Sequence, residues 1–279
     1  MSDWIPEVPA SEPLRVLPDR GVRDEAVALD RIGHVLVYGR VEDWCPEFVD
    51  DPVAVRRLLG DESARFERIA HPLVRRRFAA SRVLMRHAAA RAAGAEPGDF
   101  EVAREPGGRP YLRGLTGLDV NVSHTGQIVV AGISRSGPIG VDVESTTRRL
   151  QGLEIADRAC SPFERAVLEN LPAGRRHGYL IRLWTLKESY SKALGLGLRL
   201  PFRDFGFDLD PEAVSARLLS GDGLRPEDER WRFESHGLEG RYAVGLAVAP
   251  DALGEGASTA REPVLDDTLL AAVLGSLGD

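Results

Sequence analysis

The sequence of 279 residues predicts an α+β fold made of two similar halves. In the first half a buried strand precedes a long helical region and several short strands, and the second half again places helices before strands. A turn-rich stretch at residues 134–138 separates the two halves. No residue-level repeat links them, so their similarity is inferred from the order of the elements alone.

The first half begins, after a proline-rich start, with a predicted strand. Residues 31–41 (RIGHVLVYGRV) alternate apolar positions with turn glycines, which is typical of a buried strand. Residues 50–94 carry apolar side chains at helical spacing and predict helix, which Gly94 and Pro97 end. Short apolar runs between glycine and proline turns predict strands at residues 100–103, 120–122, 128–133 and 139–143.

The second half contains a helix whose start is indicated by the four residues Ser-Pro-Phe-Glu at positions 161–164. Ser161 has the properties of an N-cap, Pro162 suits the first turn and Glu164 occupies the third helical position. A second helix is predicted from about residue 176 to residue 194 and is ended by Gly195. Further strands are predicted at residues 205–209, 231–234 and 242–249.

These patterns predict domain boundaries as well. The first half is expected at residues 26–137 and the second at residues 138–250. Residues 1–25 contain several prolines and are expected to form a flexible lead-in. Residues 251–279 are expected to be a linker and a short terminal helix, because leucines recur there on one helical stripe.

Composition excludes several classes of protein. Lysine and arginine number 36 against 43 acidic residues, a net charge of −7, and 43% of the residues are hydrophobic. This balance is that of a globular chain, and an acidic protein with dispersed arginine is a poor nucleic-acid binder. No apolar run approaches the roughly 20 residues of a membrane span, so no membrane partner is expected. Cys45 and Cys160 lack metal-type spacing, and the first residues lack the pattern of a signal peptide, which predicts a cytoplasmic protein.

Two acidic residues stand on one predicted strand. In the segment GVDVE, Asp142 and Glu144 are two residues apart and project to the same face. Neighbouring carboxylates repel each other unless a proton or a cation lies between them, and Mg²⁺ typically takes one or two carboxylates together with phosphates and waters. The alternative is a strand end whose polar face meets solvent, and the spacing alone favours that alternative.

The only two lysines of the chain, Lys187 and Lys192, lie in one predicted helix. Glu188 and Lys192 are neighbours four residues apart, which describes either a surface ion pair or a functional pair. A compact ammonium suits phosphate oxygens in a way that guanidinium does not. Lys187 lies about 140° away around the helix, so packing or contact with a partner is as expected for it as catalysis.

A third cluster is the segment NVSHTG, a short strand that runs into a polar turn. Ser123, His124 and backbone N–H groups could converge there on an anion, although a histidine in such a place is more often structural. Arg109 precedes this segment on a rigid turn. The sequence contains no nucleophile elbow, zinc-type histidine pair, dinucleotide fingerprint or Walker loop, so any phosphate binding must rest on arginine, lysine and a metal.

The ordered combination of NVSHTG, GVDVE and WTLKESYSKALGLGL resembles the Sfp-type 4′-phosphopantetheinyl transferase family. The resemblance extends from about residue 67 to residue 200. It implies two α+β halves related by a pseudo-twofold, with coenzyme A and Mg²⁺ in the cleft between them. It also implies transfer of the phosphopantetheine arm of coenzyme A to a serine of an apo carrier protein, with release of adenosine 3′,5′-bisphosphate.

The resemblance assigns roles by position. Asp142, Glu144 and Glu188 match the metal-binding carboxylates, and Glu188 is implied to accept the proton of the carrier serine. Lys192 matches the lysine that contacts the pyrophosphate, and it is implied to assist the departing phosphate. The other implied contacts to coenzyme A are Arg77, Arg82, Arg109, Ser123 and His124. A further basic pair of the family falls near Arg65 and Arg68.

Other functions stay open at this point. A non-catalytic coenzyme A-binding protein of the same fold is one alternative, which the presence of all three carboxylates disfavours. A Mg²⁺-dependent phosphotransferase that uses ATP is another, and the absence of a kinase or Walker loop disfavours it. The length and the doubled pattern favour a monomer, because the smaller relatives with one half build their cleft between subunits. Carrier domains are typically acidic, so docking on this acidic protein must use a local basic and apolar surface.

Overall fold

The computed structural model describes residues 12–18, 29–47, 49–105, 108–148, 156, 159–220 and 231–249. The predicted linker and terminal helix at residues 251–279, and most of the lead-in at residues 1–25, lie outside the described residues.

Strands form two main sheets and one small hairpin. The first sheet has the order β1-β2-β6-β5 and contains β1 (Leu14–Arg15), β2 (His34–Arg40), β5 (Asp119–Thr125) and β6 (Ile128–Ser134). The second has the order β7-β11-β10-β9-β8 and contains β7 (Ile139–Ser145), β8 (Phe205–Leu209), β9 (Ser215–Ser220), β10 (Arg232–Leu238) and β11 (Tyr242–Val248). The hairpin consists of β3 (Glu101–Arg104) and β4 (Pro110–Arg113).

Helices connect these strands. In the first half they are α2 (Val41–Trp44), α3 (Pro52–Leu59), α4 (Ser63–Glu67) and α5 (Pro72–Ala93). In the second half they are α7 (Pro162–Asn170) and α8 (Ala173–Ala193). Single 3-10 turns are η1 (Gly60–Glu62), η2 (Pro97–Asp99) and η3 (Gly197–Arg199).

The two halves repeat one arrangement. In each half a first strand precedes a long helix, and the last strand then lies between the first strand and the penultimate one. This gives β2-β6-β5 with α5 in one half and β7-β11-β10 with α8 in the other, with antiparallel pairing throughout both triplets. The predicted α+β fold of two similar halves is therefore confirmed.

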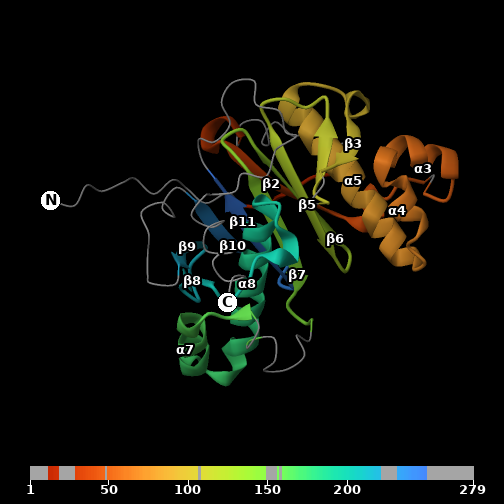
Figure 1. Cartoon of the computed structure of the whole chain (residues 1–279). Helices are drawn as coiled ribbons and strands as arrows, with labels where there is room; N and C mark the ends of the chain where they lie inside the picture. Colours follow the sequence, from red (N-terminus) through yellow and green to blue (C-terminus); the bar gives the residue numbers. More distant parts are fainter. Residues whose placement is uncertain are drawn as a thin grey trace, which may run out of the picture.

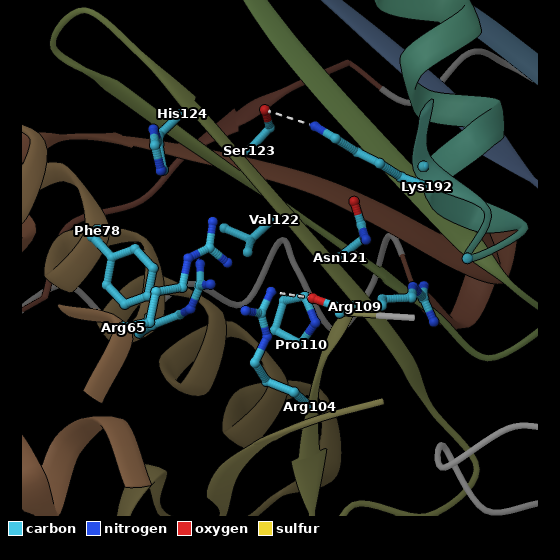
Figure 2. Close-up of a pocket in the computed structure, with 14 residues that line it drawn as sticks. Arg65, Phe78, Arg104, Arg109, Pro110, Asn121, Val122, Ser123, His124 and Lys192 are labelled. Atoms are coloured by element: carbon cyan, nitrogen blue, oxygen red, sulfur yellow. Dashed lines mark hydrogen bonds between the residues drawn. The ribbon is translucent and has the colours of Figure 1, made fainter. Parts of the chain in front are cut away.

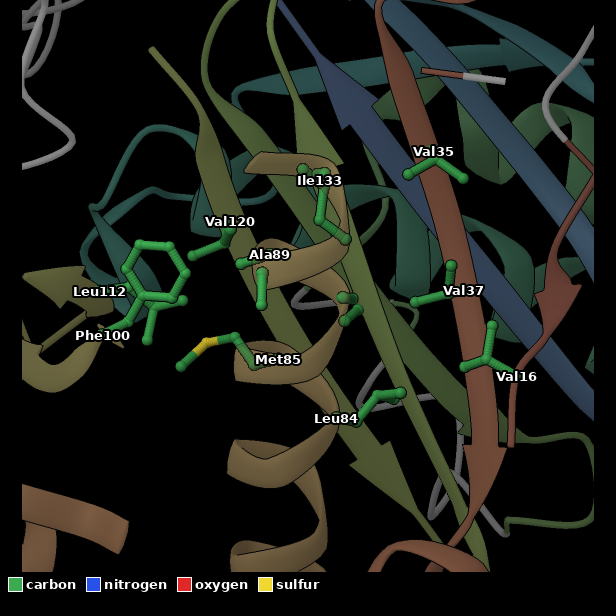
Figure 3. Packing of buried hydrophobic residues seen from close by; sticks show 14 of the residues in the cluster. Val16, Val35, Val37, Leu84, Met85, Ala89, Phe100, Leu112, Val120 and Ile133 are labelled. Atoms are coloured by element: carbon green, nitrogen blue, oxygen red, sulfur yellow. The ribbon is translucent and has the colours of Figure 1, made fainter. Parts of the chain in front are cut away.

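The layers follow from strand alternation. On β2, Val35 and Val37 belong to the core beneath α5, whereas Leu36 belongs to the core shared with β7 and β11. The two sheets therefore pack face to face, with α5 covering one and α8 covering the other (Figure 1). Figure 3 shows the first of these cores, where Leu84 of α5 points toward the sheet and Met85 points toward Phe100 and Leu112.

Helix α8 lies unusually close to the second sheet. A Cβ added at Gly140 of β7 would collide with the backbone oxygen of Ser189, and one at Gly245 of β11 would collide with that of Thr185. Since only glycine leaves room for this approach, the backbone of α8 rests directly on the two strands. The same contact places the last turns of α8 beside β7.

The start of α7 agrees with the sequence prediction. The hydroxyl of Ser161 accepts a hydrogen bond from the N–H of Glu164, and the carboxylate of Glu164 accepts one from the N–H of Ser161 at 2.7 Å. Pro162 occupies the first turn. This reciprocal pair is the capping box that the four residues indicate.

The structure departs from the sequence predictions in several places. Residues 14–15 pair in parallel with β2, and Val16 is buried, although they fall within the predicted flexible lead-in. Strands β4 and β9 were not predicted, because each mixes arginine and other polar residues into a short run. The predicted helix at residues 50–94 is divided into three helices.

None of the helices in the described part of the chain is long and apolar enough to cross a membrane.

Charged residues are buried between the two sheets at one end. Glu234 of β10 is 1% exposed and contacts the Nε atom of Arg232 at 2.5 Å and the Nε2 atom of His236 at 2.9 Å. His34 of β2 lies close enough to Glu234, Arg232 and His236 for all three to influence its pKa, and its Nε2 atom has no hydrogen-bond partner among the described residues. Burial is the main cause that lowers the pKa of His34 to about 4.

This histidine makes stability depend on pH. Between its ordinary pKa of 6.5 and about 4, the unfolded chain binds a proton at His34 that the folded chain does not. The free energy of unfolding should therefore fall as the pH decreases through that window, by up to about 1.4 kcal/mol per pH unit. Urea denaturation at several pH values should show that the free energy of unfolding depends less steeply on pH for His34→Gln than for the wild type. The exposed His177→Gln is the control, and parallel curves for His34→Gln and wild type would contradict this assignment.

Candidate active site

A cavity of about 330 Å³ lies between the two halves (Figure 2). Residues of α5, β5 and the β3–β4 hairpin form one wall, and the end of α8 forms the other. Its lining includes the cationic side chains of Arg65, Arg82, Arg104, Arg109 and Lys192. The cavity is thus locally basic within a chain of net charge −7, which favours an anionic ligand.

The three motifs meet beside this cavity. The ammonium of Lys192 on α8 donates to Asp142 Oδ1 on β7 at 2.6 Å and to the Oγ atom of Ser123 on β5 at 3.0 Å. The hydroxyl of Ser123 also lies 2.8 Å from Asp142 Oδ1. The structure therefore brings together one residue from each of three segments that are far apart in the sequence.

Glu188 lies one helical turn before Lys192 and is half-buried. Its pKa is raised above the ordinary value, first by burial and then by the negative charge of Asp142, while Lys192 and Arg148 act in the opposite direction. A carboxylate with a raised pKa is a better proton acceptor near neutral pH. The effect of Asp142 also shows that the two acidic groups are close enough to interact.

Glu144, the third predicted metal ligand, has other partners. Its Oε2 atom accepts a hydrogen bond from the hydroxyl of Thr125 at 3.2 Å, and its Oε1 atom forms an ion pair with Arg148. Both oxygens are thus engaged, whereas Asp142 Oδ2 is buried and has no partner among the described residues.

The fit of these residues to a divalent cation is therefore uneven. Within the described part of the chain, no group of three or more histidine, cysteine or acidic side chains is arranged to hold a metal ion. Asp142 and Glu188 nevertheless suit one, because an unpartnered oxygen and a neighbouring carboxylate favour a cation between them. Glu144 could join them once Arg148 leaves it.

His124 lines the cavity on the strand end of β5. Its Nδ1 atom is buried and has no partner among the described residues. Burial, followed by the positive charges of Arg82, Arg77 and Lys192, lowers the pKa of His124 to about 4. The imidazole is therefore neutral at physiological pH and has a ring nitrogen available to a ligand.

Arg82 is held rigidly at the cavity wall. Its Nε and Nη2 atoms donate to the carboxylate of Glu62 at 2.5 and 2.7 Å, and its guanidinium lies 4.4 Å from the ring of Phe78. Glu62 is fully buried and was not among the predicted site residues. Its position in a short 3-10 turn between two helices gave no sequence signal.

Arg109, predicted to contact the ligand, is mainly committed to the protein. Its two terminal nitrogens donate to the carboxylate of Asp119 at 2.9 and 2.7 Å, and Nη2 also donates to the carbonyl of Ile139 at 2.6 Å. Arg77 lies outside the cavity lining but affects the pKa of His124. Arg65 and Arg104 line the cavity, and only Arg65 had a sequence signal, as part of the upstream basic pair.

Lys187 has a structural position. Its side chain is fully buried, with Nζ 2.8 Å from Glu164 Oε2. It also donates to the carbonyl oxygens of Phe202 at 2.5 Å and Phe205 at 2.7 Å. Of the two possibilities for Lys187, the structure therefore supports packing.

Two protein-family models match the chain in succession. The model described as 4′-phosphopantetheinyl transferase, N-terminal, matches residues 42–135, and that of the 4′-phosphopantetheinyl transferase superfamily matches residues 138–247. The boundary between the two matches falls at the turn that joins β6 to β7.

Individual relatives carry the same description. A 4′-phosphopantetheinyl transferase of Bacillus subtilis is 35% identical over 140 residues, which cover 50% of this chain and 61% of the relative. The 4′-phosphopantetheinyl transferase Sfp of Bacillus subtilis strain 168 is 33% identical, with 46% of this chain and 55% of the relative covered. A phosphopantetheinyl transferase of Thraustochytrium is 29% identical, with 75% and 76% covered.

The match spans less than two thirds of the length of both Bacillus proteins. Both halves of this chain are nevertheless matched in order, and the three motifs that carry the sequence resemblance lie together in the fold. The chain belongs to the 4′-phosphopantetheinyl transferase superfamily.

Proposed function

We propose that the protein transfers the 4′-phosphopantetheine arm of coenzyme A to a serine of an apo carrier protein and releases adenosine 3′,5′-bisphosphate. The observation that carries this proposal is the meeting of Ser123, Asp142 and Lys192 beside a basic cavity between the halves. Relatives named 4′-phosphopantetheinyl transferase support the same activity.

The cavity suits the anionic end of coenzyme A. Arg65, Arg82 and Arg104 line it, and guanidinium groups pair well with phosphate oxygens. Glu62 holds Arg82 in place before any ligand arrives, which lowers the entropy cost of binding. His124 is neutral in the free protein and would gain a proton more readily beside a bound phosphate.

The reaction is an in-line displacement at the β-phosphorus of coenzyme A. The serine oxygen of the carrier forms a bond to that phosphorus, and the bond to the oxygen of the departing adenosine 3′,5′-bisphosphate breaks. Glu188 accepts the serine proton, helped by its raised pKa. Lys192 neutralises the charge that develops on the departing phosphate. The nucleophile comes from the carrier, so the enzyme needs none of its own.

A divalent cation has a place in this scheme. Asp142 and Glu188 would hold Mg²⁺, with Glu144 as a third ligand after it releases Arg148. When bound, the cation would supply neutralisation of the pyrophosphate charge. The single chain contributes both walls of the cavity, which supports a monomer. The proposal also places the protein in the cytoplasm, where it would act on carriers of fatty acid, polyketide or peptide synthesis.

Product release tests the proposal against its alternatives. Incubation with coenzyme A, Mg²⁺ and a panel of apo carrier domains should yield adenosine 3′,5′-bisphosphate in a carrier-dependent manner, and a chelator should abolish it. Binding of coenzyme A without product, with every carrier, would favour the non-catalytic binding protein. Transfer of a phosphoryl group from ATP instead would favour the other phosphotransferase.

A further inference from the structure

One edge of β7 faces β5 and is completed by side chains instead of a strand. β7 pairs with β11 along its whole length, so the N–H and C=O groups of alternate residues point to the opposite edge. Those of Ile139 and Val141 point there, and both residues are fully buried. Buried backbone groups need partners, and other residues of the site provide them.

The first residue of β7 whose backbone is paired with side chains in this way is Ile139. Its N–H donates to Asp119 Oδ2 at 2.8 Å, and its carbonyl accepts from Arg109 Nη2 at 2.6 Å. Arg109 and Asp119 are themselves joined by two hydrogen bonds and are both buried. This pair therefore gives Ile139 the two hydrogen bonds that a neighbouring strand would provide.

The second such residue is Val141, which directly precedes Asp142. The N–H of Val141 donates to Asn121 Oδ1 at 3.0 Å, and its carbonyl accepts from Lys192 Nζ at 3.1 Å. Lys192 also holds Asp142 Oδ1 at 2.6 Å. The segment that carries Asp142 is thus fixed by Asn121 through one peptide group and by Lys192 through the next.

Asn121 itself is well placed for this role. It is 3% exposed and stands on β5 two residues before Ser123, so the side chains of both project to the same face of the strand. Ser123 then contacts Asp142 directly. On β5, Asn121 therefore holds the backbone of β7, and Ser123 holds the carboxylate of Asp142.

We propose that Asn121 is a positioning residue, which holds the Val141 N–H and thereby places Asp142 and Lys192 for the transfer. Its effect on catalysis rests on the proposed function, whereas its effect on the position of Lys192 does not. Without the Asn121 side chain the buried N–H of Val141 lacks its partner, so β7 must shift or admit water there. Either change displaces Asp142 and the ammonium that holds it.

The two lysines make a direct spectroscopic test possible. Protein labelled with ¹³C at lysine contains two lysine spin systems, those of Lys187 and Lys192. Asn121→Ala should move the side-chain resonances of Lys192 and leave those of Lys187, which is held by Glu164, unchanged. Unmoved Lys192 resonances in this variant would overturn the proposal.

A matched control separates positioning from general destabilisation. Ser235→Ala removes the hydrogen bond from Arg182 Nε, at 3.0 Å, in the half that carries Lys192. It also deletes one buried polar contact, but it should move neither lysine. Lys192 resonances displaced equally in both variants would show a general loosening of the half and would overturn the proposal.

Kinetics distinguish positioning from ligand contact, because Asn121 also lines the cavity. A positioning role lowers kcat of Asn121→Ala about tenfold or more and leaves KM for coenzyme A within about twofold of wild type. A raised KM with unchanged kcat would make Asn121 a ligand contact and overturn the proposal. If the wild type transfers nothing, the proposed function fails, and the lysine spectra still decide the role of Asn121.

Discussion

Asp142→Asn is expected to lower the turnover of phosphopantetheine transfer by about 10²–10³-fold while the protein stays folded. Asparagine keeps the size of the side chain and an acceptor for Ser123 and Lys192, whose contacts to Oδ1 are 2.8 and 2.6 Å. It removes the negative charge, and with it the unpartnered buried oxygen that suits a cation. The variant should therefore show a large loss of turnover and a small change in melting temperature.

The measurement is kcat at several Mg²⁺ concentrations, together with a thermal melt. Asp208→Asn is the matched control, because its exposed ion pair with Arg217 contributes little to stability and lies away from the cavity. That control should retain wild-type turnover. Turnover of Asp142→Asn near that of wild type at millimolar Mg²⁺ would refute the assignment of Asp142 to the metal.

Lys187→Met is expected to reduce the free energy of unfolding by about 3–5 kcal/mol, because it leaves the buried carboxylate of Glu164 without its cation. Lys187 and Glu164 are both 0% exposed and 2.8 Å apart. Glu164 also accepts hydrogen bonds from the N–H groups of Ser161 and Phe207, at 2.7 and 2.8 Å. The pair therefore joins α8 to the start of α7 and to β8.

Lys192→Met provides the comparison for this variant. The side chain of Lys192 is 26% exposed, and the Lys192→Met variant should lose most activity with a much smaller change in stability. Urea denaturation of the two variants measures the difference. If Lys187→Met is within about 1 kcal/mol of wild type, the buried ion pair does not have the importance assigned to it.

Local signals in the sequence were enough for most of the fold. The capping box at Ser161 and Glu164 and the apolar runs of β6 and β7 depend on neighbours in the chain, and such features can be read without the structure. Strand β9 could not be read, because only Ala216 and Leu218 mark its buried face, which is too short an alternation to distinguish a strand from a polar loop. Its pairing with β8 and β10 stabilises it instead.

In the candidate site, too, some residues were indicated by local sequence signals and others only by the folded structure. The motifs indicated Ser123, Asp142 and Lys192, and the fold brings these three together. The roles of buried partners were not visible, because they depend on contacts between distant segments. Glu164 lies 23 positions before Lys187 in the sequence, and Asn121 lies 20 positions before Val141. Neither separation has a periodic signature, so only the folded chain reveals these pairs.

The intact mass of a carrier protein shows directly whether the phosphopantetheine arm is transferred. An apo carrier domain incubated with this protein, coenzyme A and Mg²⁺ should gain about 340 Da, the mass of the arm moved in a phosphoryl-transfer reaction of this kind. Replacement of the carrier serine by alanine should abolish the gain, and ATP in place of coenzyme A should not produce it. No mass change on any carrier of a broad panel, with coenzyme A and Mg²⁺ present, would contradict the account.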